Sequence, residues 1–387
     1  MAHTVKARTG GRLVAETLEA LGAEVAFGVP GIHALAIWDG LRTSSIRSVG
    51  LRTELSAGFA ADGYARTSGR PAPLLLSTGP GALISLAALM EAASAHVPVV
   101  AVASQIPSDL IGAGRGFLHE LPDQKASFAP VVKWAARAES AEEIPDVLAE
   151  AWRRALTPPS GPTFVEIPVD LLTSGTDVPA VTDLDITPPT LPLPTPDALD
   201  EAARLLTGAQ RPVLWAGGGV LRSGAWEELR LVSEGLGAPV ASTYMGKGTF
   251  PEDDPLAVGT AADEPAFKEL VEGADVLLAV GTELGAETTG QHSLQLSGRL
   301  IHVDADPDRI GATYDALGLV GDAKAVLGAL AERLPGTPRD DGPARVAELR
   351  RRIEERLGTQ SRDAELGLLA GLRQTLPRAA VTAWDMT

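Results

Sequence analysis

The chain has 387 residues, more than one hydrophobic core usually accommodates, so we expect two or three units of α/β size. Its 45% hydrophobic and 4% aromatic content favours helices packed closely on a sheet over a β-sandwich. The net charge of −17 argues against nucleic acid or a membrane surface as a partner, and the lack of cysteine excludes disulfides, thiolate metal sites and thiol catalysis.

The N-terminal sequence MAHTVKARTGGRL contains no apolar signal segment. No later stretch reaches the roughly 20 apolar residues that a membrane-spanning helix needs. We therefore expect a cytoplasmic protein.

From residue 11 to about residue 170, segments with helical periodicity alternate with short β-rich runs, which is typical of a parallel sheet covered by helices on both faces. The candidate strands are 24–29, 46–51, 73–77, 98–104 and 163–167. The first three end in the turn sequences GVPG, RTE and TGPG. Because ligands of open α/β sheets bind beyond the carboxyl ends of the strands, we expect these turns to share one rim and to carry the chemistry.

The proline-rich run DITPPTLPLPTP favours extended backbone, which predicts a linker at 176–196 between a first domain at 1–175 and a second at 197–335. The second domain should be another doubly wound sheet, with strands at 212–216, 239–242, 276–280 and 300–303. Residues 336–363 should form a further linker and a charged helix with a solvated face. Residues 364–387 begin a helix and then a strand, which predicts the start of an incomplete third α/β domain.

The segment RTELSAGFAADGYAR places Glu54 just after a strand, in the first turn of a helix rich in alanine and glycine. The simplest interpretation is an acid that the helix dipole favours, worth up to about 1 kcal/mol. However, the small residues let another backbone approach closely, and Thr78, Gly79, Pro80 and Gly81 form a second tight turn. This context favours a surface for a flat heterocycle, with Glu54 holding one of its ring nitrogens.

Four segments, in order, resemble the pyrimidine-binding domain of thiamine-diphosphate-dependent enzymes such as acetolactate synthases, pyruvate oxidases and benzoylformate decarboxylases. They are GVPG, RTELSAGFAADGYAR, LLLSTGPGALISLAALMEAASAHVPVVAVASQ and GPTFVEIPVDLL. The second domain resembles the central domain of the same superfamily through RPVLWAGGGV, GKGTFPEDDPLAVG, ADVLLAVGTEL and LIHVDADPDRIG. The resemblance extends from about residue 11 to residue 334.

This resemblance implies thiamine-diphosphate-dependent decarboxylation of a 2-oxoacid with carboligation, as in acetolactate synthases. It matches Glu54 to the glutamate that hydrogen-bonds the cofactor's pyrimidine ring and helps to deprotonate its thiazolium carbon. Other expected cofactor contacts are Thr78, Gly79, Pro80 and Gly81, together with Val29, Pro30 and Gly31, which could equally form a plain turn after a strand.

His119 lies in a region where acetolactate synthases carry a glutamine near the substrate, so we weigh a catalytic role against that of an ordinary loop histidine. This departure from the family pattern keeps a simple 2-oxoacid decarboxylase, without carboligation, as the alternative function. The stretch GTELGAETTG in the second domain also departs from the flavin-binding relatives and argues against FAD.

The family holds Mg²⁺ and the diphosphate with a Gly-Asp-Gly segment followed by asparagines, and the chain contains no Gly-Asp-Gly. We expect those Mg²⁺ ligands in a third domain that is missing or truncated here. A non-catalytic binding or assembly module therefore stays open as a further alternative. The resemblance also implies a homodimer or homotetramer, with the helix after Glu54 and residues 82–97 as candidates for a two-fold interface.

The remaining polar and glycine-rich features are best explained structurally. We expect His33 and His96 to have structural roles. The glycine run at 217–219 does not continue into G-x-G-x-x-G, so it predicts a tight turn rather than a phosphate site. Asp304 and Asp306 are expected to cap the turn that follows them.

Overall fold

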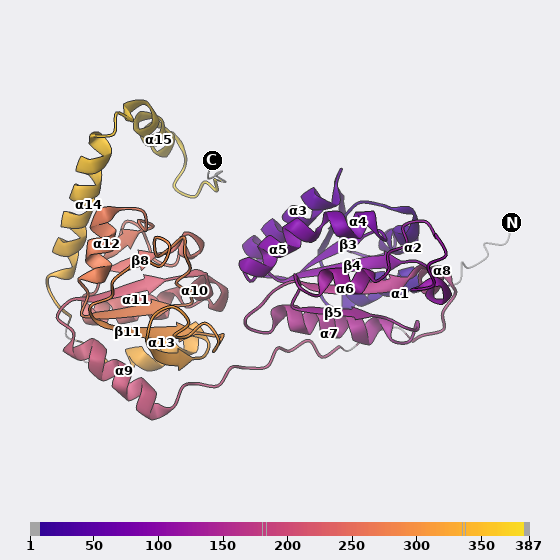
Figure 1. Cartoon of the computed structure of the whole chain (residues 1–387), viewed down its shortest axis with the longest axis horizontal. Helices are drawn as coiled ribbons and strands as arrows, with labels where there is room; N and C mark the ends of the chain where they lie inside the picture. Colours follow the sequence, from indigo (N-terminus) through magenta and orange to yellow (C-terminus); the bar gives the residue numbers. More distant parts are fainter. Residues whose placement is uncertain (1–7, 180, 183, 335, 337, 383–387) are drawn as a thin grey trace. The chain divides into compact units, whose positions relative to one another are not determined.

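The computed structural model describes residues 8–179, 181–182, 184–334, 336 and 338–382. The chain divides between Leu191 and Pro192 into two compact units, and each unit is built on one six-stranded sheet (Figure 1). Neighbouring strands of both sheets pair in parallel throughout. Among the described residues, none of the helices has the length and apolar character needed to cross a membrane.

The first sheet has the strand order β2-β1-β3-β4-β6-β5. In chain order its strands are β1 (Val25–Gly28), β2 (Arg47–Gly50), β3 (Ala72–Leu76), β4 (Val99–Gln105), β5 (Trp134–Arg137) and β6 (Thr163–Pro168). The four central strands are continuous runs of buried residues, as expected where helices cover both faces. The chain first adds a strand on one side of β1 and then crosses to β3 on the other side. The carboxyl ends of β1 and β3 therefore form the topological switch point, where open α/β sheets bind their ligands.

Helices cover both faces of this sheet. They are α1 (Gly10–Ala20), α2 (Leu35–Leu41), α3 (Glu54–Ser68), α4 (Pro80–Ile84), α5 (Leu86–Ser94), α6 (Gln124–Phe128), α7 (Ile144–Leu156) and α8 (Val169–Thr173). One hydrophobic core joins α1, α2 and α7 to strand residues that include Leu75 and Val102. The other joins α3, α5 and α6 to strand residues of opposite parity, such as Leu74 and Leu76. Figure 1 shows α3 and α5 on one face of the sheet and α7 on the other.

The small residues of α3 allow it to pack closely on its neighbour. Thr53 caps the N-terminus by accepting a hydrogen bond from the backbone N–H of Ser56, and Gly69 ends the helix with a φ of 68°. A β-carbon on Gly58 would lie 2.6 Å from Cβ of Ala88 on α5, so a larger residue would force the two helices apart. This packing fixes the first turn of α3, which contains Glu54, at the rim of the sheet.

The second sheet has the strand order β12-β11-β10-β7-β8-β9. Its strands are β7 (Pro212–Ala216), β8 (Val240–Ser242), β9 (Ala257–Gly259), β10 (Val276–Val280), β11 (Arg299–Asp304) and β12 (Leu317–Val320). The helices of this unit are α9 (Pro196–Gly208), α10 (Gly218–Ser223), α11 (Trp226–Leu236), α12 (Pro265–Glu272), α13 (Ala323–Ala331), α14 (Gly342–Gly358) and α15 (Asp363–Thr375). Helices α9, α11 and α13 share a core on one face, and α12 and α14 share a core on the other. The predicted fold class of two doubly wound parallel sheets is thus confirmed.

Three strands were not predicted from the sequence, namely β5, β9 and β12. Each consists of only three or four residues and lies at an edge of its sheet.

The C-terminal region contains a charged helix, α14, within the linker and helix expected at 336–363, and one side of this helix is buried. Val346 and Leu349 of α14 are buried in the core beside α12, although the opposite side of the helix is charged and exposed as predicted. The many charged residues of this helix mask its narrow apolar stripe in the sequence. In α15, all of which lies in the described part of the chain, no residue is buried. Residues 377–382 form no strand, and the rest of the strand expected near the C-terminus lies outside the described residues.

Candidate functional site

The carboxyl ends of β1 and β3 bring three of the predicted site residues together. Glu54 is half-buried at the start of α3, and its carboxylate lies against the backbone of Gly81. A β-carbon on Gly81 would stand 3.0 Å from Oε1 of Glu54 and 3.2 Å from Cβ of Ser77. A β-carbon on Gly31 would stand 2.3 Å from the same Cβ of Ser77, so any side chain there would clash. Gly31 and Gly81 therefore both lie beside Ser77, and Gly81 also lies beside Glu54.

Ser77 has the properties of a binding residue, although the sequence analysis did not single it out. Its side chain is 5% exposed, and its hydroxyl has no hydrogen-bond partner within the described part of the chain. Buried polar groups are nearly always hydrogen-bonded, so an unpartnered one at a ligand-binding rim indicates a ligand atom. Gly31 and Gly81 make room for the side chains of Ser77 and Glu54, which offer a hydroxyl and a carboxylate to a ring that carries hydrogen-bonding atoms. The residues present thus fit the pyrimidine ring of thiamine diphosphate.

The turn at 78–81, here called the TGPG turn, is held by buried polar contacts. Thr78 is fully buried, and its hydroxyl lies 3.0 Å from the hydroxyl of Ser104 on β4. Gly79 adopts a φ of 63°, and its backbone N–H donates to Oε1 of Gln124 at 2.6 Å. Pro80 occupies the first position of α4, where its missing N–H leaves no intrahelical hydrogen bond unmade.

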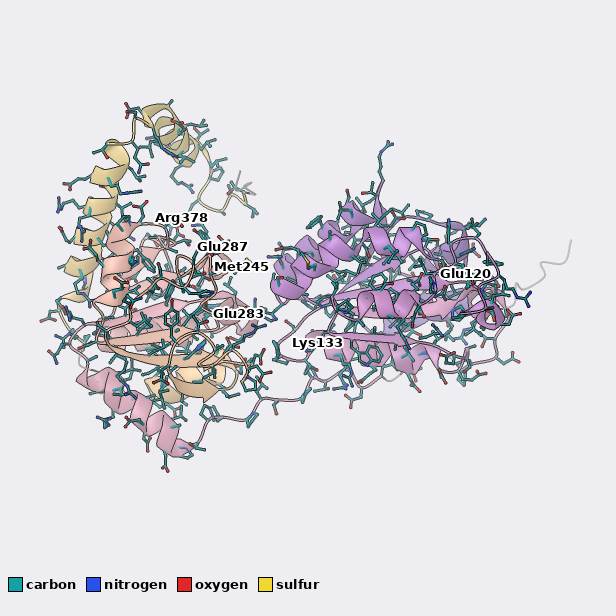
Figure 2. All side chains as sticks on the ribbon, in the orientation of Figure 1. Glu120, Lys133, Met245, Glu283, Glu287 and Arg378 are labelled. Carbon is teal, nitrogen blue, oxygen red and sulfur yellow. The ribbon has the colours of Figure 1, made fainter. Side chains whose placement is uncertain are left out.

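The structure places His119 against the TGPG turn. Its backbone has a φ of 66°, which is uncommon for a residue other than glycine. A β-carbon on Gly79 would lie 2.4 Å from the carbonyl oxygen of His119, so this contact also requires glycine. Figure 2 labels Glu120, the residue that follows His119 in the first unit. The carboxylate of Glu120 accepts hydrogen bonds from the backbone N–H groups of Phe117, at 2.9 Å, and Arg115, at 3.3 Å. These amides lower the pKa of Glu120 and hold the loop that presents His119.

A second histidine lies beside His119. The rings of His33 and His119 meet edge to face with their centroids 5.6 Å apart, and Nδ1 of each ring lacks a partner among the described residues. Burial, reinforced by His119, lowers the pKa of His33 and favours its neutral form. We expected a structural role for both His33 and His96. His33 lies beside His119 at the candidate site, and His96 precedes β4, where its carbonyl accepts a hydrogen bond from Ser160.

A buried polar network behind the TGPG turn was also missed. Glu166 on β6 is fully buried and accepts hydrogen bonds from Arg137 at 2.6 Å, Gln124 at 3.0 Å and Gln105 at 3.1 Å. Burial raises the pKa of Glu166, and the Arg137 guanidinium opposes that rise. One signal could have revealed this network, because a lone acid interrupts the otherwise uncharged strand sequence TFVEIP.

The second unit shows the structural roles that we expected for its marked residues. A β-carbon on Gly217 would lie 2.2 Å from the carbonyl oxygen of Gly281, so this glycine permits a tight backbone approach after β7. Asp304 accepts a hydrogen bond from the N–H of Asp306 at 2.9 Å, and Asp306 accepts one from Asp308 at 3.0 Å. Among the described residues, no group of three or more histidines and acids is arranged to hold a metal ion.

Comparison with protein families identifies both units. Residues 8–127 match the family model of the thiamine pyrophosphate enzyme N-terminal TPP binding domain. Residues 199–330 match the model of the thiamine pyrophosphate enzyme central domain. The first match contains every residue of the candidate rim, from Gly31 to His119.

Individual relatives agree with these matches. The chain is 38% identical over 387 residues to the probable 2-ketoarginine decarboxylase AruI of Pseudomonas aeruginosa, covering 99% of this chain and 68% of that protein. It is 34% identical to the acetolactate synthase large subunit of Corynebacterium glutamicum, covering 84% of this chain and 52% of that subunit. The chain thus spans about two thirds of the first relative and about half of the second.

A solved structure shows the same fold. The crystal structure of an enzyme from Mycobacterium smegmatis, assigned as thiamin diphosphate-dependent, superposes with a TM-score of 0.74 at 28% sequence identity. The superposition covers 87% of this chain and 64% of that one. Together with the two family models and the relatives, it shows that the chain belongs to the thiamine pyrophosphate enzyme family.

Proposed function

We propose that this chain forms part of a thiamine-diphosphate-dependent enzyme that decarboxylates a 2-oxoacid with carboligation, as acetolactate synthases do. The observation that carries the proposal is the arrangement of Glu54, Gly81 and the unpartnered hydroxyl of Ser77 at the switch point of the first sheet. When bound, thiamine diphosphate supplies the electron sink that allows carbon dioxide to leave a 2-oxoacid.

Each residue of the rim has a defined task in this proposal. Glu54 holds a ring nitrogen through its carboxylate and shares a proton with it, since a half-buried acid can act in acid-base catalysis. Gly31, Gly79 and Gly81 make room for Ser77, His119 and Glu54 respectively. Val29, Thr78 and Pro80 shape the two turns. His119 and the neutral His33 can donate or accept a proton beside the TGPG turn. The ligands of Mg²⁺ and the diphosphate belong to a further part of the enzyme.

A simple 2-oxoacid decarboxylase is the second candidate. It is favoured by His119, whose carbonyl group and Cβ pack against Gly79 of the TGPG turn and whose imidazole can deliver a proton, and by a relative named as a probable 2-ketoarginine decarboxylase. Proton delivery ends the reaction at an aldehyde, whereas carboligation needs a second carbonyl compound. Incubating the enzyme with pyruvate separates the two candidates, because a carboligase yields acetolactate and a simple decarboxylase yields only an aldehyde. With 2-ketoarginine, a simple decarboxylase likewise yields only the aldehyde.

We further propose a cytoplasmic homodimer or homotetramer that uses α3, α4 and α5 as its two-fold interface. Four large apolar side chains are exposed on these helices, namely Leu55 (37%), Phe59 (48%), Ile84 (48%) and Met90 (60%). Apolar side chains gathered on adjacent helices are typical of a protein interface. The small helix residues favour the close, self-complementary packing of a two-fold contact.

Glu54→Gln in the natural enzyme tests the function. The amide keeps the size of the side chain but cannot exchange a proton, so we expect turnover of the 2-oxoacid to fall roughly 10²- to 10⁴-fold. The free energy of unfolding, measured by thermal melting, should change by at most about 1 kcal/mol, the contribution of a first-turn acid. The control is Glu201→Gln on α9, whose side chain is 42% exposed and pairs with Arg204 at the surface. Near-normal turnover in Glu54→Gln would overturn the proposed mechanism.

A further inference from the structure

We propose that Gln124 is a positioning residue that locks the TGPG turn to the loop carrying His119, and that a buried network centred on Glu166 holds Gln124 in place. The inference rests on the proposed function, because it assumes that the TGPG turn contacts thiamine diphosphate.

The side-chain amide of Gln124 makes hydrogen bonds through both its oxygen and its nitrogen. Its oxygen accepts the hydrogen bond from the N–H of Gly79 at 2.6 Å. Its nitrogen donates to the backbone carbonyl of Ser104 at 3.1 Å and to Oε2 of Glu166 at 3.0 Å. Gln124 is 0% exposed, so water cannot replace any of these partners. Because reversing the amide would break all three contacts, the side chain has one allowed orientation.

Gly79 is the point at which the turn needs support. Its φ of 63° is left-handed, and its backbone is packed against the carbonyl of His119. The turn leads into α4, a helix of only five residues that cannot hold the backbone by itself. Gln124 begins α6, directly after the loop that contains His119. The hydrogen bond from Gly79 to Gln124 therefore ties the turn and the loop to each other.

Glu166 anchors this contact from the interior of the sheet. Its carboxylate is fully buried on β6 and is held by Arg137 on the edge strand β5 at 2.6 Å. The same oxygen that accepts from Gln124 also accepts from Gln105, at 3.1 Å. The network thus extends from the edge strand of the sheet to the TGPG turn.

Gln105 provides a matched control within the same network. It is 1% exposed and donates to the same oxygen of Glu166. Its own oxygen, however, accepts from the backbone N–H of Ile106 at 2.7 Å and not from the TGPG turn. Replacing either glutamine with methionine removes one bond to Glu166 at nearly constant side-chain length. Only the change at 124 also removes the acceptor of Gly79.

The experiment compares Gln124→Met and Gln105→Met in the natural enzyme. Both variants should lower the melting temperature, and Gln124→Met should lower it more, because Gln124 makes three side-chain hydrogen bonds and Gln105 makes two. Only Gln124→Met should weaken binding of thiamine diphosphate, by about tenfold in Kd at saturating Mg²⁺, the scale of one lost hydrogen bond. In the absence of cofactor, hydrogen–deuterium exchange of the peptide at 77–84 should be faster in Gln124→Met than in Gln105→Met.

The outcomes separate this inference from the proposed function. Wild-type enzyme that does not bind thiamine diphosphate would overturn the proposed function, while the exchange measurement would still test the contact at Gly79. If wild type binds the cofactor, equal Kd values or equal exchange in the two variants would overturn the positioning role. If Gln124→Met does not fold, the experiment uses Gln124→Asn and compares it with Gln105→Asn. Asparagine is one methylene shorter, so its amide oxygen no longer reaches the N–H of Gly79.

Discussion

The carboxylate of Glu54 occupies the space beside Gly81, so that a β-carbon on Gly81 would lie 3.0 Å from Oε1 of Glu54. Gly81 is the second residue of α4, and its φ lies outside the left-handed region, so alanine could adopt the same backbone. The glycine is therefore needed for the space that it leaves beside the carboxylate and not for its conformational freedom.

Gly81→Ala should consequently separate stability from activity. Alanine favours a helix by about 0.5 to 1 kcal/mol over glycine, which should offset most of the strain against Ser77. The added methyl group should displace the carboxylate of Glu54, so we expect turnover of the 2-oxoacid to fall by at least about tenfold, since small misplacements of a catalytic group are costly. Thermal melts and steady-state rates measure the two effects.

The control for this variant is Gly235→Ala on α11, outside the proposed interface. A β-carbon on Gly235 would meet no atom within 4 Å, so this change should stabilise the helix and leave turnover unaltered. Unchanged turnover in Gly81→Ala would show that the space beside Glu54 is not needed.

The depressed pKa of His33 predicts a loss of stability in acid. Burial first, and then the neighbouring His119, lower this pKa below its ordinary 6.5. The unfolded chain then binds a proton that the folded chain resists, so stability should fall as the pH drops from about 6.5 through the folded-state pKa. Urea unfolding between pH 7.5 and 5 should show a shallower decline in His33→Asn than in wild type.

His119→Asn distinguishes the two causes of that shift. It removes the smaller, electrostatic cause and leaves the burial of His33 in place, so most of the acid-dependent decline should persist. If stability declines equally steeply with falling pH in wild type and in His33→Asn, His33 is not the group that causes the loss of stability in acid.

The sequence predicted the central strands well because their burial produces continuous apolar runs. Strands β7 and β10 match their predicted bounds. The missed strands β5, β9 and β12 have only one neighbouring strand each, and β5 is half-buried along its whole length. Short edge strands carry little hydrophobic patterning, so their pairing depends on contacts that no local pattern reveals.

The candidate site was predictable only where a local sequence pattern marks its residues. Glu54 and the TGPG turn have local signals, an acid at a helix start and a strand followed by glycines. Gln124, in contrast, acquires its role only when the fold brings it to Gly79, which is 45 residues away in the chain. His33 was given a structural role because its contact with His119 also arises from tertiary structure.

The exposed apolar face of α3 and α5 predicts the effect of charge at the proposed two-fold interface. In Phe59→Glu combined with Met90→Glu, two carboxylates would be buried without partners in the dimer, so we expect a monomer at micromolar concentration. Size-exclusion chromatography with light scattering measures the mass. Leu231→Glu on α11, where the leucine is 47% exposed, is the control and should keep the wild-type mass. A double variant with the wild-type mass, or a monomeric wild type, would contradict the interface.

Removing Arg137 from its buried ion pair with Glu166 should destabilise the fold, and the pH dependence of the loss should show whether the buried charge is its cause. Arg137→Met leaves a fully buried carboxylate with only amide donors, from Gln105 and Gln124. Breaking a buried ion pair in this way costs about 3 to 5 kcal/mol near neutral pH. The already raised pKa of Glu166 should rise further, because the guanidinium that opposes the rise is gone.

A carboxyl group with a raised folded-state pKa loses stability as the pH rises from its ordinary value of 4.5 through the folded-state value, because only the unfolded chain releases the proton freely. The deficit of Arg137→Met relative to wild type should therefore be larger at pH 8 than at pH 5 in urea unfolding. Glu139→Gln removes only the exposed partner of Arg137, 3.9 Å away, and should cost less than about 1 kcal/mol at both pH values. Adding Glu166→Gln to Arg137→Met should abolish the pH dependence, since the amide carries no charge. If the deficit of Arg137→Met is the same at both pH values, lost packing and not the buried charge is its cause.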